Sequence, residues 1–171
     1  MVKMTSAYAN KLLKQLNDDK EFWANKERTS FVYTAAVGET PVIPEYDYKE
    51  VAATIAELDN KICRIKHAIN LANVTTQVEV DGQMLFIDTI LVRMAQLNKR
   101  KSMLDIMRKQ QPKTRLEQNA FASRSAAPEY QYINYDLELV KQEYESITTE
   151  IMNMQLALDR YNQTYEFEVD I

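Results

Sequence analysis

The chain has 171 residues, 46% of them hydrophobic and 27% charged, and a net charge of −4, which is typical of one soluble domain. Because Gly38 and Gly82 are the only glycines, the sequence argues against a glycine-rich phosphate loop, a Rossmann turn and a many-turned β fold. The negative charge argues against attraction to nucleic acid or anionic lipid. Cys63 is the one cysteine, so no internal disulfide can form.

The N-terminal region is predicted to be a helix from Ser6 to Lys26, capped by Thr5 or Ser6. The polar residues 17–20 interrupt its apolar face, so we expect a break there. Residues 31–37 are rich in β-branched and aromatic side chains and are followed by a glycine, which predicts a short strand.

A second helix is predicted to begin after Asp47, with Glu50 as the partner of a capping box, and to run to about Asn73. Its apolar residues recur at alternating steps of three and four, which is typical of a heptad seam. This upstream seam consists of Val51, Ile55, Leu58, Ile62, Ile65, Ile69 and Ala72.

The middle of the chain is predicted to contain a β-hairpin near residues 76–86, with a type I′ turn at Asp81 and Gly82. A third helix is expected from about Asp88 to Gln110. An irregular connector over residues 111–133 follows it.

The last long helix carries the strongest pattern in the sequence. It is expected to begin at Asn134 as N-cap, to end near Asn162, and to carry an apolar seam of about four heptads. Residues 165–171 alternate apolar and acidic side chains, which predicts a half-buried strand that pairs with residues 31–33. The seam residues are Leu137, Val140, Tyr144, Ile147, Ile151, Met154, Leu158 and Tyr161.

Together these patterns predict a mainly α fold with short β elements. We expect a single helical domain over residues 1–171: an elongated antiparallel helical bundle or coiled coil of three long helices (48–164), an N-terminal helix and extended segment (1–47), and a C-terminal strand (165–171). No apolar run approaches the roughly 20 residues of a membrane span, and residues 1–16 lack an apolar core of signal-peptide length. A cytoplasmic location is therefore expected.

Four segments carry a resemblance to a known family: IKHAINLAN (65–73), DGQML (81–85), FASRS (121–125) and LALDRYNQT (156–164). Over roughly residues 51–164, the chain resembles an uncharacterised bacterial helical family labelled septicolysin-like. The label implies a membrane-damaging activity, and the family offers no catalytic residues to carry over. The first fifty residues and Tyr165 depart from the family pattern.

Cys63 and His67 share a helix face at a spacing that suits metal ligands. No other Cys or His exists to complete a zinc site, so we interpret both as packed or half-exposed side chains. A nucleophilic set would have to use the same His67, on a helix whose backbone N–H groups are already bonded. We therefore predict no catalytic residue, no metal site and no cofactor.

Charge is unevenly distributed in the second half of the chain. Basic residues gather between Arg93 and Arg124, and acidic residues dominate from Glu129 onward. We expect antiparallel pairing of the basic and acidic helices, within one chain or between subunits. The alternative is an anion site on the connector, formed by Lys113, Arg115, Arg124 and Ser125.

The function that these patterns favour is a non-enzymatic, self-associating scaffold or protein-interaction protein. Its expected partners are further copies of itself or another protein, rather than nucleic acid or membrane. The alternatives are a membrane-acting protein that inserts residues 78–91, and anion or nucleic-acid binding through the basic helix and connector. The candidate contacts for a partner subunit are Phe22, Trp23, Tyr130, Tyr132 and Phe167.

Overall fold

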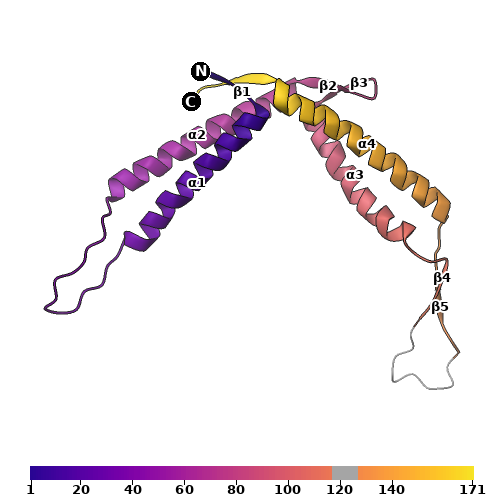
Figure 1. The fold of residues 1–171 in the computed structure, drawn as a ribbon, viewed down its shortest axis with the longest axis horizontal. Coiled ribbons are helices and arrows are strands. Elements are labelled where there is room, and N and C mark those ends of the chain that lie inside the picture. Colours follow the sequence, from indigo (N-terminus) through magenta and orange to yellow (C-terminus); the bar gives the residue numbers. More distant parts are fainter. Residues whose placement is uncertain (117–126) are drawn as a thin grey trace. The chain divides into compact units, whose positions relative to one another are not determined.

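The computed structural model describes residues 1–116 and 127–171, and it confirms a mainly α fold with short β elements (Figure 1). The chain divides into a first unit, residues 1–78 with 158–171, and a second unit, residues 79–157. The helices are α1 (Ser6–Ser30), α2 (Tyr48–Thr75), α3 (Ile87–Arg108) and α4 (Leu137–Thr164). The strands are β1 (Val2–Thr5), β2 (Gln77–Val80), β3 (Gln83–Phe86), β4 (Lys113–Arg115), β5 (Tyr130–Tyr132) and β6 (Glu166–Val169).

The first unit is built on an antiparallel pair, α1 and α2, covered at one end by a two-stranded sheet (Figure 1). In that sheet β1 pairs antiparallel with β6, from Val2 opposite Val169 to Thr5 opposite Glu166. Lys20 Nζ of α1 lies 2.6 Å from Asp59 Oδ1 of α2, and this ion pair links the two helices. The buried core of this unit includes Met4, Ala9, Leu13, Leu16, Leu58, Ile62, Ile65 and Val169.

Two predictions for the N-terminal region are wrong. Helix α1 continues through residues 17–20 without a break, because Leu13 and Leu16 are buried and Lys20 is paired with Asp59. Residues 31–37 form no strand, since β propensity alone does not hold a strand that lacks a neighbour to pair with. The partner of β6 is therefore β1, which the sequence analysis missed, and not residues 31–33.

Side-chain caps fix where three helices begin. Thr5 Oγ1 accepts a hydrogen bond from Tyr8 N, and Asp47 Oδ1 accepts from the amides of residues 49 and 50 at 2.8 and 3.3 Å, so both predicted caps are confirmed. For α4 the predicted cap, Asn134, is wrong. Asp136 Oδ1 accepts from the amides of residues 138 and 139 at 2.9 and 3.1 Å instead.

The second unit contains α3 and most of α4, which run antiparallel (Figure 1). The predicted hairpin is present as β2 and β3, and its turn residues Asp81 and Gly82 have φ angles of 50° and 80°, as a type I′ turn requires. A further antiparallel ribbon, β4 with β5, lies in the connector that had been predicted to be irregular.

Both predicted seams face the protein interior. In α2 the buried seam residues are Val51, Leu58, Ile62, Ile65 and Ala72, and in α4 they are Val140, Ile147, Met154, Leu158 and Tyr161. The helix pairing differs from the predicted core of three helices, because α2 packs on α1 while α3 is joined to α4. A heptad seam specifies that a helix is covered, but not which helix covers it.

Candidate interaction surfaces

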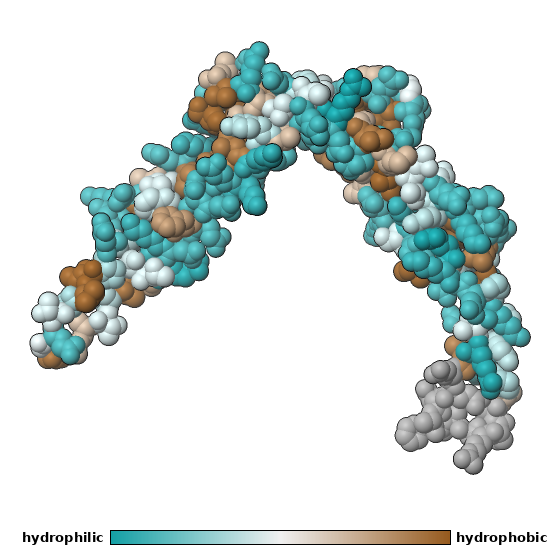
Figure 2. Space-filling model, in the orientation of Figure 1, coloured by the Kyte–Doolittle hydropathy of each residue, from teal (hydrophilic) through white to brown (hydrophobic). Residues whose placement is uncertain are grey.

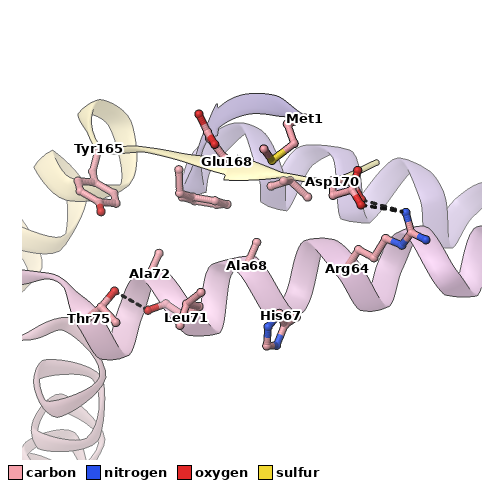
Figure 3. A pocket seen from close by; sticks show the side chains of 12 residues that line it. Met1, Arg64, His67, Ala68, Leu71, Ala72, Thr75, Tyr165, Glu168 and Asp170 are labelled. Atoms are coloured by element: carbon pink, nitrogen blue, oxygen red, sulfur yellow. Dashed lines mark hydrogen bonds and ion pairs between the residues drawn. The ribbon is translucent and has the colours of Figure 1, made fainter.

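A groove of about 510 Å³ lies between α2 and β6 in the first unit (Figure 3). Small and aliphatic side chains of α2, Ala68, Leu71 and Ala72, form one wall. Phe167 and Val169 form the other, because the alternation of β6 turns every second residue toward the helix. The lining is therefore mainly apolar.

Three polar residues of this groove, Arg64, Asp170 and Thr75, are engaged with their own surroundings. The Arg64 guanidinium lies 3.6 Å from Asp170 Oδ2 and donates a hydrogen bond of 3.3 Å to the Asp170 carbonyl. Thr75 Oγ1 donates to the Leu71 carbonyl at 2.7 Å. The groove thus offers a mainly apolar slot, and His67 and Glu168 also belong to its polar lining.

Cys63 and His67 lie on α2, and both side chains are exposed rather than packed. Figure 3 shows the His67 ring on the side of α2 away from β6. Within residues 1–116 and 127–171, no group of three or more His, Cys, Asp or Glu side chains is placed to hold a metal ion.

The β4–β5 ribbon brings together residues that the sequence analysis had assigned to two separate roles. Its register sets Lys113 opposite Tyr132 and Arg115 opposite Tyr130. Lys113 Nζ lies 4.1 Å from the Tyr130 ring centroid and 5.5 Å from that of Tyr132, so one cation lies within cation–π distance of both predicted aromatic contacts, which remain exposed. Arg124 and Ser125, the remaining candidates for an anion site, lie outside the described residues.

The other predicted partner contacts lie in the first unit. Trp23 and Phe167 are half-buried and pack against its core, and Lys26 Nζ lies 5.1 Å from the Trp23 ring centroid. Phe22 meets Trp23 edge to face at 5.8 Å and is largely exposed. A role for these residues in association stays a prediction.

The basic face of α3 pairs with the acidic α4, as the charge pattern predicted. Arg93 Nη2 lies 2.9 Å from Glu150 Oε1, and Arg100 donates two hydrogen bonds, of 3.0 and 3.1 Å, to Glu143. The hydrogen bonds to Glu143 raise the pKa of the Arg100 guanidinium. These pairs neutralise part of the positive charge of α3 within its own unit.

Large apolar side chains off the two seams remain exposed. Three groups stand out among them, on α3, on α4 and in the loop between α1 and α2, where residues 31–37 are the segment that was predicted to be a strand. The groups are Val92, Met103 and Ile106 on α3; Leu139, Met152 and Leu156 on α4; and Phe31, Val32, Tyr33, Val37, Val42 and Ile43 in the loop.

The comparisons with known proteins inform the fold alone. No protein-family model matches the chain, and no curated protein does. The crystal structure of a functionally unknown conserved protein from Corynebacterium diphtheriae is similar, with a TM-score of 0.67 and 15% identity, over 98% of this chain and 100% of that chain. None of the helices in the described parts of the chain has the length and hydropathy needed to cross a bilayer.

Proposed function

We propose that this chain is a non-enzymatic interaction scaffold that associates with further copies of itself. One observation carries the proposal: most residues of both heptad seams are buried within the chain, yet large apolar side chains off the seams remain exposed. Contiguous exposed apolar surface marks sites of protein–protein contact. Association must then use surfaces other than the seams.

The architecture of each unit supports this proposal. A pair of helices covers only the facing side of each helix, so apolar residues on other sides stay in water unless another layer is added. Within the first unit this applies to Phe22 of α1 and to Tyr48 of α2. A second copy of the chain can supply that layer.

The polar groups Arg64, Asp170 and Thr75 in the groove between α2 and β6 favour a binding role over catalysis. Arg64 is paired with Asp170, and the Thr75 hydroxyl is bonded to the backbone of its own helix. An acid–base or nucleophilic mechanism needs titratable groups within hydrogen-bonding reach of one another and of a substrate. The apolar lining instead suits the side chain of a protein partner.

Light scattering coupled to size exclusion tests the proposal, from low to high micromolar protein. We expect the weight-average mass to rise from that of one chain toward that of two or more, because buried apolar surface drives association by mass action. A mass that stays at one chain throughout this range would contradict self-association.

A further inference from the structure

The loop between α1 and α2 contains the densest group of exposed apolar side chains in the first unit. Residues 31–43, here called the tip loop, include six large apolar residues that are each between 53% and 107% exposed. Figure 2 shows hydrophobic residues at this end of the α1–α2 pair. Those six are Phe31, Val32, Tyr33, Val37, Val42 and Ile43.

The tip loop is held in place at its base and at its apex. The Tyr46 hydroxyl donates a hydrogen bond of 3.1 Å to Glu27 Oε1, which ties the end of the connection back to α1. At the apex Glu39 N donates to the Ala36 carbonyl at 3.2 Å, and Gly38 adopts a φ of +87°, which favours glycine. This turn holds Val37 out in solvent.

The charge pattern distinguishes the tip loop from the other exposed apolar groups. Between Arg28 and Glu45 the only charged residue is Glu39. The exposed apolar residues of α3 are instead interrupted by cations, since Lys99 to Lys101 lie between Val92 and Met103. Single apolar residues among charges are ordinary surface, whereas a contiguous uncharged group indicates a contact.

The occupant that fits the loop best is a protein surface rather than a bilayer. Residues 29–48 contain no Lys or Arg to meet lipid phosphates, and Glu39 and Glu45 would be repelled by anionic lipid. Among the described residues, no hydrogen bond joins the backbone of residues 32–35 to another part of the chain. Hydrocarbon could not satisfy these amides, but a second polypeptide can.

We propose that the tip loop is the surface through which two copies of this chain associate, loop against loop. The proposal rests on the self-association proposed above and names its contact. In a two-fold contact each residue lies near its own counterpart, so a patch with little charge avoids repulsion between the copies. Six side chains that are each more than half exposed supply apolar area on the order of several hundred Å², a large part of the roughly 800 Å² per partner that a standard interface buries.

The experiment compares two double variants in the full chain. Val32→Glu with Ile43→Glu places charges in the tip loop, at side chains that are 64% and 63% exposed. Val92→Glu with Ile106→Glu is the matched control on α3, at side chains that are 59% and 57% exposed. All four positions face solvent, so both variants should keep the helix content and melting temperature of the wild type, measured by circular dichroism.

The dissociation constant of each protein is measured by sedimentation equilibrium. We expect the loop variant to weaken association by about tenfold or more, because like charges would be buried against each other. The control should stay within about threefold of the wild type, the change expected of ordinary surface. A loop variant that associates as tightly as the wild type overturns the loop contact and leaves self-association standing.

Two other results separate the remaining alternatives. A wild type that is monomeric throughout overturns self-association and the loop contact together. If that monomer also sediments with vesicles of neutral or anionic phospholipid, and the loop variant does not, the loop's partner is a bilayer instead of a second copy.

Discussion

Two buried hydroxyls meet where α1 begins and α4 ends. Ser6 and Tyr161 are both buried, and neither hydroxyl has a hydrogen-bond partner of good geometry within the described part of the chain. Burial raises the pKa of Tyr161, while the nearby hydroxyls of Thr76 and Ser6 offset part of that rise. The Tyr161 ring stacks on the Tyr165 ring, with 5.0 Å between their centroids. The packing of the ring and the hydroxyl therefore contribute separately to stability.

Tyr161→Phe tests the contribution of this hydroxyl. The variant keeps the ring and removes a buried polar atom, so its stability near neutral pH should lie within about 1 kcal/mol of the wild type. Because the pKa of Tyr161 is raised in the folded state, folding favours the neutral phenol. This contribution to stability is present below pH 10.0, the ordinary pKa of tyrosine, and is lost as the pH rises above that value. The wild type should therefore lose stability above pH 10.0 more steeply than Tyr161→Phe, in urea unfolding followed by circular dichroism.

The same two proteins supply the control for the other tyrosines. The other tyrosines are the same in both chains, so only the difference between the two pH profiles reports on Tyr161. Parallel profiles would show that its phenol is no harder to ionise in the folded protein than in the unfolded chain.

Within a single helix, neighbouring leucines differ sharply in burial. In α4, Leu158 lies on the seam and is 5% exposed, whereas Leu156 lies off the seam and is 62% exposed. Because both are leucines in the same helix, helix propensity is the same for both. Any difference between their alanine variants therefore measures packing.

Leu158→Ala is expected to lower the free energy of unfolding by about 2–5 kcal/mol, through lost apolar burial and the cavity left behind. Leu156→Ala should change it by about 0.5 kcal/mol or less. Denaturant unfolding of the two variants and the wild type, at one protein concentration, measures both. Equal losses at the two positions would refute the seam assignment.

Features set by local sequence could be predicted, whereas the pairing between elements could not. The heptads predicted the buried faces of α2 and α4, and Asp47 predicted the start of α2, because period and cap chemistry are local. The pairing of α2 with α1 could not be predicted, since a seam is the same whichever helix covers it. Residues 31–37 were misread because β propensity has no effect without a neighbouring strand.

The candidate surfaces were predicted only in part, for the same reason. The composition of the connector singled out Lys113, Tyr130 and Tyr132, but their cation–π contact depends on two three-residue strands far apart in sequence. The exposure of the tip loop depends on the pairing of α1 with α2, which leaves residues 31–43 uncovered. The sequence alone does not specify that pairing.

At the scale of the whole molecule, the apolar tip loop is separated from most of the charge. Each chain has a net charge of −4, and the cation–carboxylate contacts between α3 and α4, Arg93 with Glu150 and Arg100 with Glu143, are made within the chain. Two copies therefore repel each other weakly at low ionic strength. The tip loop, with Glu39 as its one charge, contributes little to that repulsion.

This separation predicts how association responds to salt. Added NaCl shortens the Debye length to about 8 Å at physiological ionic strength, which screens the repulsion between two negative chains and leaves an apolar contact intact. We expect the dissociation constant, measured by sedimentation velocity, to stay within about threefold or to fall slightly as NaCl is raised. Sodium sulfate should lower it further, because sulfate strengthens apolar burial. A steep weakening in NaCl would instead place the contact on charged groups such as Lys113 and Arg115 of the β4–β5 ribbon.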